Sequence, residues 1–122
     1  MTGILIIDDT EEDLKRTRDI LSQAGYRVTG IAQDGESGLQ QYCEISPELV
    51  IIDLILPGMN GIDLLQKIRE VNPSARIILC TSAGQGPVID LAMRSGANGY
   101  VVKPYDPEIL LSAVRRILGS PG

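Results

Sequence analysis

Residues 49–61 constrain the fold of this chain more than any other stretch. Four apolar residues, from Leu49 to Ile52, run without alternation into a single carboxylate, Asp53, and a turn rich in proline and glycine follows. An unbroken apolar run of this length predicts a strand that is covered on both faces, as in a parallel sheet. A charge directly after a buried strand is costly unless another group compensates for it. The central question is therefore what surrounds Asp53.

Strand-like and helix-like segments alternate along the rest of the chain. Further strands are predicted at 3–7, 26–32, 76–81 and 100–102, and helices at 11–24, 36–45, 62–71, 88–95 and 107–118. The alternating pattern of 26–32 indicates an edge strand. This order predicts an α/β fold, a doubly wound five-stranded parallel sheet with helices on both faces. One domain is expected over 1–118, with 119–122 as a tail or the stub of a linker.

Two of the predicted helices begin with recognisable capping residues. Thr10 is predicted to be an N-cap, with Asp13 at the third helical position in the manner of a capping box. Asp106 and Pro107 have the residue types of an N-cap and a first helical position.

Composition excludes several classes of function. The net charge is −5 and the chain has no histidine, so neither a basic nucleic-acid surface nor imidazole-based catalysis is expected. Two cysteines are too few for a disulfide framework, and Cys80 lies in an apolar run typical of a core. The sequence contains no signal peptide and no apolar run long enough to cross a membrane. It therefore predicts a cytoplasmic protein without direct contact to nucleic acid or membrane.

Polar residues follow the predicted strands where each strand ends. Asp8 and Asp9 follow the first strand, Asp53 the third, Thr81 the fourth and Lys103 the fifth. In an open parallel sheet these ends line one crevice, so the carboxylates are expected to crowd together. A hard divalent cation such as Mg²⁺ would relieve their repulsion. From the residues alone, the cluster is either a static network of ion pairs or a site that accepts a tetrahedral anion.

This set of residues resembles the receiver domain of two-component response regulators, and the chemotaxis-regulator type most closely. The motifs that carry the resemblance are Asp8-Asp9, Asp53 with Pro57 and Gly61 downstream, Thr81, and Lys103-Pro104. The resemblance extends from Ile4 to about Leu118. It implies a flavodoxin-like sheet with strand order 2-1-3-4-5.

The resemblance also implies a role for each residue of the crevice. Asp53 would accept a phosphoryl group from a histidine kinase, a phosphotransfer protein or a small acyl phosphate. Mg²⁺, or Mn²⁺ in its place, would be held by Asp8, Asp9, Asp53 and the backbone carbonyl of Ile55. Lys103 would contact the phosphoryl oxygens, and its bond to Pro104 would be cis. Such a protein promotes its own phosphorylation and dephosphorylation but is not a turnover enzyme.

A conformational switch is implied as well. Thr81 would turn its hydroxyl toward the phosphoryl group and Tyr100 would turn inward. The face formed by the fourth helix, the fifth strand and the fifth helix would then bind a downstream protein, with the chain acting as a monomer or as a phosphorylation-dependent dimer.

The sequence leaves three alternatives to a free-standing receiver domain. The chain could be an isolated receiver fragment of a larger response regulator or hybrid kinase whose output domain is missing. A flavodoxin-like electron carrier would need aromatic residues to stack a flavin, and the chain has no Trp or Phe. A Mg²⁺-dependent aspartate phosphatase would carry a second carboxylate two residues after the nucleophile, where this chain has Ile55.

Overall fold

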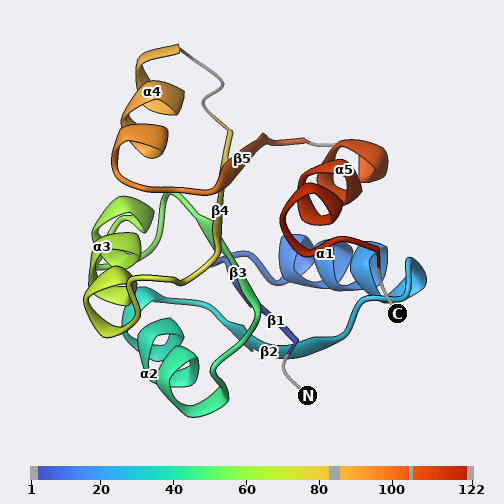
Figure 1. The fold of residues 1–122 in the computed structure, drawn as a ribbon, viewed down its shortest axis with the longest axis horizontal. Coiled ribbons are helices and arrows are strands. Elements are labelled where there is room, and N and C mark those ends of the chain that lie inside the picture. The colour runs from blue at the N-terminus through green and yellow to red at the C-terminus, as the bar shows by residue number, and fades with distance from the viewer. Residues whose placement is uncertain (1–2, 83–85, 105, 121–122) are drawn as a thin grey trace.

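The computed structural model describes residues 3–82, 86–104 and 106–120, which form ten elements in strict alternation. The strands are β1 (Ile4–Ile7), β2 (Val28–Ala32), β3 (Leu49–Asp53), β4 (Ile77–Thr81) and β5 (Gly99–Val102). The helices are α1 (Glu11–Gln23), α2 (Gly35–Ile45), α3 (Gly61–Val71), α4 (Gly86–Arg94) and α5 (Pro107–Leu118). Figure 1 shows α1 and α5 on one side of the strands and α2, α3 and α4 on the other.

The strands form one parallel sheet in the order β2-β1-β3-β4-β5. This confirms the doubly wound, flavodoxin-like order that the resemblance implied. It also confirms β2 as an edge strand. Because β1 and β3 are neighbours in register, with Ile7 opposite Ile52, the residues that follow them emerge side by side at the carboxyl edge of the sheet.

Two hydrophobic cores lie on the two faces of the sheet. On β1, Leu5 and Ile7 belong to the core under α2, α3 and α4, whereas Ile4 and Ile6 belong to the core under α1 and α5. Neighbouring β3 divides its side chains in the same way. This is the period of two expected for a strand that is buried on both faces, and it explains why the sequence of β3 shows no polar alternation.

Local signals set most element ends. Asp34, Asn60 and Asp106 each accept a hydrogen bond from the backbone of the helix they precede, which is the N-cap arrangement. Gly25, with a φ of 95°, follows α1 as the expected C′ residue. Two bounds differ from prediction by two residues, because β2 begins at Val28 rather than at residue 26 and α4 begins at Gly86 rather than at 88. The other bounds agree with prediction to within one residue.

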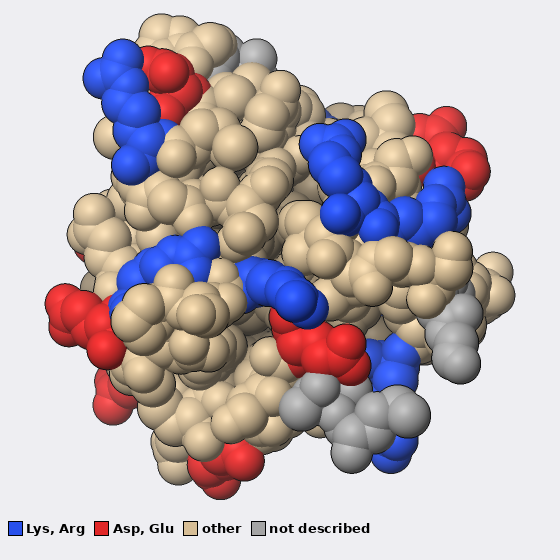
Figure 2. All heavy atoms as spheres, viewed as in Figure 1, with Lys and Arg blue, Asp and Glu red and all other residues tan. Residues whose placement is uncertain are grey.

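Charged side chains of both signs lie on the surface. On the face in Figure 2, a basic and an acidic group lie side by side over α4, where Asp90 and Arg94 form an ion pair of 2.6 Å. Among the described residues, no helix is both long and apolar enough to cross a bilayer.

Candidate functional site

Three carboxylates meet at the carboxyl edge of the sheet. Asp8 directly follows β1, Asp9 comes next, and Asp53 is the last residue of β3. Each offers one carboxylate oxygen, and these oxygens lie within 4.8 Å of one another. The parallel pairing of β1 with β3 produces this cluster, because it carries both strand ends to the same point.

Asp8 is the most rigidly held of the three. Its side chain is buried, and one carboxylate oxygen, Oδ1, accepts a hydrogen bond of 3.1 Å from the backbone N–H of Thr10. The other oxygen, Oδ2, lies 2.5 Å from Nζ of Lys103. With both oxygens engaged, Asp8 has little freedom to change partners.

The predicted capping box at the start of α1 is wrong. Thr10 does occupy the N-cap position, but its side chain makes no capping hydrogen bond. The Thr10 hydroxyl instead donates to Asp9 at 3.4 Å, and Asp13 receives a hydrogen bond of 3.0 Å from Lys103. The reason is electrostatic, because a carboxylate gains more from a nearby ammonium than from a neutral backbone N–H.

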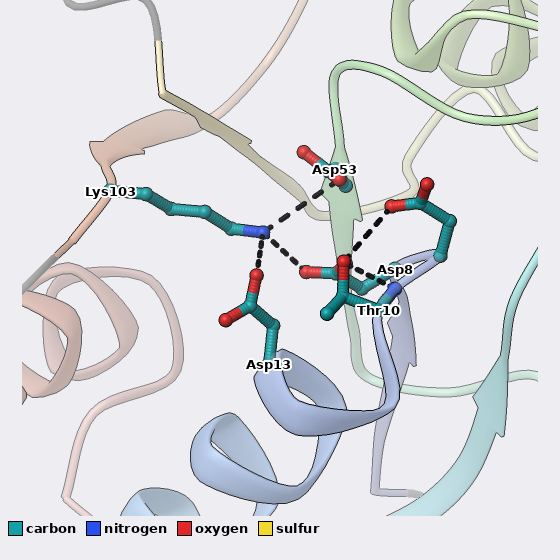
Figure 3. Close-up of polar contacts among 6 residues, drawn as sticks. Asp8, Thr10, Asp13, Asp53 and Lys103 are labelled. Atoms are coloured by element: carbon teal, nitrogen blue, oxygen red, sulfur yellow. Dashed lines mark hydrogen bonds and ion pairs between the residues drawn. The ribbon is translucent and has the colours of Figure 1, made fainter.

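Lys103 reaches into the cluster from the loop after β5 (Figure 3). Its Nζ atom lies 2.5 Å from Asp8, 3.0 Å from Asp13 and 3.7 Å from Asp53. Its backbone N–H donates to the carbonyl of Thr81 at 2.7 Å, which ties the loop to the end of β4. The Lys103–Pro104 peptide bond is cis, as the resemblance implied.

Burial raises the pKa of Asp53 from 3.8 to about 6. The charge of Lys103 opposes this shift, and the charges of Asp8 and Asp9 add to it. For Lys103, burial lowers the pKa, but the hydrogen bonds to Asp8 and Asp13 outweigh it, so the pKa is raised and the ammonium stays charged. The site thus holds more negative charge than its lysine neutralises.

The start of α3 packs closely against the end of β3, next to Asp53. A Cβ atom on Gly61 would lie 2.6 Å from the carbonyl oxygen of Asp53 and 2.9 Å from Cα of Leu54. Only glycine lets the start of α3 approach the strand end this closely. The Gly61 N–H donates to the carbonyl of Leu54 at 2.7 Å, so the loop that contains Ile55 and Pro57 is closed over a short span.

The chain matches the family model described as the response regulator receiver domain over residues 4–115. It belongs to this family. It is 35% identical over 114 residues to the chemotaxis protein CheY of Thermotoga maritima, covering 93% of this chain and 95% of that protein. It is 36% identical over 115 residues to CheY of Bacillus subtilis, covering 94% and 96%. Its fold is similar to that of a chain in the crystal structure of a CheX–CheY–BeF₃–Mg²⁺ complex from Borrelia burgdorferi, with a TM-score of 0.91 and 28% identity. The match covers 95% of this chain and 88% of that chain.

A receiver domain of two-component signalling is a phosphoacceptor rather than a turnover enzyme. The acidic pocket of Asp8, Asp9 and Asp53 fits a Mg²⁺-dependent phosphoacceptor. Oxygen ligands from carboxylates are the donors that this hard cation prefers, and the excess negative charge of the pocket favours a divalent cation.

The two residues expected to switch lie on β4 and β5 of the receiver domain. Thr81 ends β4 and is buried, next to the backbone of Lys103. Tyr100, opposite Leu79 in the sheet, is 41% exposed. A cavity of about 360 Å³ lies beside Tyr100 and is lined by residues of α4, β5 and α5.

Sequence reasoning placed Asp8, Asp9, Asp53, Thr81 and Lys103 at one edge of the receiver domain, and the structure brings them together there. It missed the contact of Asp13 with Lys103. The available signal was an unusual density of acidic residues, three of them, in the first turn of α1. Helix-dipole stabilisation explains such residues equally well, so the pattern alone does not single out Asp13.

Proposed function

We propose that this receiver domain accepts a phosphoryl group on Asp53 from the phosphohistidine of a histidine kinase or phosphotransfer protein. One observation carries the proposal: Asp53 shares a pocket with two further carboxylates and with the ammonium of Lys103. Small acyl phosphates can serve as alternative donors, because catalysis of this kind depends on positioning and charge rather than on a particular leaving group.

The contacts favour Asp53 over Asp8 as the acceptor. Both oxygens of Asp8 are engaged at short distances, by Lys103 and by the backbone of Thr10. Asp53 lies farther from Lys103, at 3.7 Å. With a pKa of about 6, Asp53 is ionised at neutral pH, and its burial leaves the carboxylate less solvated and more reactive than one in water.

Asp8, Asp9, Asp53 and the backbone carbonyl of Ile55 are the groups that would hold Mg²⁺ or Mn²⁺. When bound, the cation supplies charge neutralisation for the phosphoryl oxygens and for the acidic pocket. The fit rests on the hard oxygen donors and on the closeness of the three carboxylates.

In the proposed step, an oxygen of Asp53 forms a bond to phosphorus as the P–N bond of the donor's phosphohistidine breaks. The electron pair of that bond stays on the imidazole nitrogen. Lys103 provides positive charge to a phosphoryl oxygen during this in-line transfer. Attack of water on the phosphorus of the acyl phosphate later restores the carboxylate and releases inorganic phosphate.

Phosphorylation would then change the face formed by α4, β5 and α5. Thr81 would turn its hydroxyl to a phosphoryl oxygen, and Tyr100 would move inward from its exposed position. The result is a local charge change that biases a two-state surface for a downstream protein.

The proposal is tested by intact-mass spectrometry after incubation with acetyl phosphate and Mg²⁺. We expect one phosphoryl adduct of about 80 Da that is labile in base, as an acyl phosphate is, and that is lost in Asp53→Asn or on addition of a chelator. Asp63→Asn, an exposed aspartate on α3, is the matched control and should keep the adduct. An adduct that survives in Asp53→Asn would reject Asp53 as the acceptor.

A further inference from the structure

Asp13 contacts the reactive pocket but has no part in the proposed phosphoryl transfer. It projects from the first turn of α1 toward Lys103 (Figure 3). Its carboxylate lies 3.0 Å from the ammonium, closer than the carboxylate of Asp53 at 3.7 Å. The lysine is thus held by two residues of the β1–α1 region and only approaches the proposed acceptor.

An ammonium has three N–H donors in a compact group. In this structure two of them serve hydrogen bonds to Asp8 and Asp13, at 2.5 and 3.0 Å. A phosphoryl group on Asp53 would bring additional negative charge that needs the same donors. Only one donor of Lys103 is left for the new oxygens, so movement of the ammonium toward Asp53, or a second hydrogen bond to the phosphoryl group, weakens its bonds to Asp8 or Asp13.

The two carboxylates differ in how easily they release Lys103. The side chain of Asp8 is 6% exposed, whereas that of Asp13 is 37% exposed. Asp13 also borders a cavity of about 270 Å³, which Arg16 lines one turn farther along α1. Water and a nearby cation can therefore stabilise Asp13 when it separates from Lys103, while Asp8 would be left as an unpaired buried charge.

We propose that Asp13 is a positioning residue that restrains Lys103 and so disfavours the phosphorylated state. This inference rests on the proposed function of Asp53. In the unphosphorylated protein, Asp13 holds the ammonium away from Asp53. Phosphorylation must break or weaken this ion pair, and the lost interaction lowers the stability of the phosphorylated form. Asp13 thereby sets how readily the receiver is activated.

The test measures affinity for beryllium fluoride, a non-covalent mimic of a phosphoryl group, by ¹⁹F NMR at saturating Mg²⁺. Saturation separates the effect on Lys103 from any change in metal affinity. Asp13→Asn should bind the mimic about two- to fivefold more tightly, the range expected for loss of a partly exposed ion pair. Asp13→Ser should act in the same direction, whereas Asp13→Glu should return toward the wild-type affinity.

The matched control is Glu12→Gln, which removes one charge from the same first turn of α1 at an exposed position. It should leave the affinity unchanged, because a helix-dipole effect is shared by both residues but the contact to Lys103 is not. In a Lys103→Ala background, Asp13→Asn should have no effect on affinity.

Two results would overturn the inference. If both Asp13→Asn and Asp13→Ser bound the mimic with unchanged or lower affinity, Asp13 would not restrain Lys103. Tighter binding that persists in the Lys103→Ala background would mean that Asp13 acts on the phosphoryl group directly. Failure of the proposed function is distinguished by the mass of the wild-type chain, which would then gain no adduct on Asp53.

Discussion

Two cations stabilise opposite ends of the same sheet, and they face different kinds of acceptor. Lys103 follows β5 at the carboxyl edge and contacts the carboxylates of Asp8, Asp13 and Asp53. Arg69, on α3, reaches the loops that precede β4 and β5 at the other edge. Both side chains are partly buried and have several partners, so the number of partners does not distinguish their roles.

The acceptors of Arg69 are neutral and fixed in the backbone. Its guanidinium donates to the carbonyls of Pro73, Ala75 and Gly96, the first at 3.3 Å and the last at 2.5 Å. It also donates to Oδ1 of Asn98 at 2.9 Å, and the same oxygen accepts from the backbone of β4. The planar fork of five donors suits such a set of directed bonds.

The difference indicates what each cation is for. Arg69 satisfies backbone carbonyls at loop ends and has no reason to move, because its partners carry no net charge. Lys103 lies among more negative charge than it can neutralise, and its partners compete for it. A cation with surplus acceptors can be redirected by a small change in charge, whereas one with a fixed set of neutral acceptors cannot.

The largest expected effect concerns the structural cation. Arg69→Met should lower the free energy of unfolding by about 3 kcal/mol, because several partly buried carbonyls lose their donor. The measurement is urea denaturation followed by circular dichroism. Arg94→Met, in an exposed ion pair on α4, is the control and should cost less than about 0.5 kcal/mol.

The same Arg69→Met variant should still form the phosphoryl adduct at a rate within about threefold of wild type at a temperature where it is folded. If Arg69→Met changed the free energy of unfolding no more than Arg94→Met, Arg69 would contribute no more to stability than an exposed residue. The contrast between a structural Arg69 and a functional Lys103 would then be wrong.

Lys103→Ala should have the opposite profile. At saturating Mg²⁺ the rate of adduct formation with acetyl phosphate should fall about 100-fold, the usual cost of removing a group that stabilises transition-state charge. Lys67→Ala, an exposed lysine on α3, should leave the rate unchanged. The rates are obtained from the time course of intact mass. A decrease of only a few fold would show that Lys103 contributes to the pocket mainly as a structural counter-ion.

The smallest effect is a dependence of stability on pH that the carboxyl edge should show and the Arg69 edge should not. Asp53 has a pKa of about 6 in the folded protein against 3.8 ordinarily. The folded state therefore binds more protons between these values, and its stability decreases as pH rises through this window. Without metal, the raised pKa of Asp53 should lower the free energy of unfolding of the wild-type protein by about 2 kcal/mol between pH 4.5 and pH 7.5. Asp53→Asn should not show this decrease.

This prediction is checked by urea denaturation of both proteins at the two pH values, in buffer with chelator. The quantity compared is the difference between variant and wild type, since the other carboxylates are common to both. Asp63→Asn serves again as the control. A difference that does not grow as pH rises would indicate that Asp53 titrates normally, and that burial does not disfavour its charged form in the folded protein.

Much of the fold followed from patterns that are local in the sequence. The apolar run before Asp53 gave the buried strand, and Asp106 with Pro107 gave the start of α5, because strand burial and N-capping depend on residues within one or two turns. Convergence of Asp8 and Asp53 needed one further rule, that parallel strand ends share an edge. The exact strand order came from the resemblance.

The capping box of Thr10 and Asp13 shows where local reasoning failed. The residue types and spacing were right, yet Asp13 pairs with Lys103, which lies 90 positions later in the chain. A capping box predicts that the Asp13 carboxylate accepts a hydrogen bond from the backbone N–H of Thr10 when no stronger donor is near. A distant ammonium brought to the same place competes successfully, because a charge-assisted hydrogen bond is the stronger interaction.

The sequence by itself determined the alternation of strands and helices, the burial of β1 and β3, and the residue types available at the carboxyl edge. Only the tertiary structure decided which acceptors each cation obtained: Asp13 for Lys103, and the backbone carbonyls of two distant loops for Arg69. Periodicity and capping are properties of neighbouring residues, whereas these partnerships exist only after the sheet has formed and its strand ends are aligned.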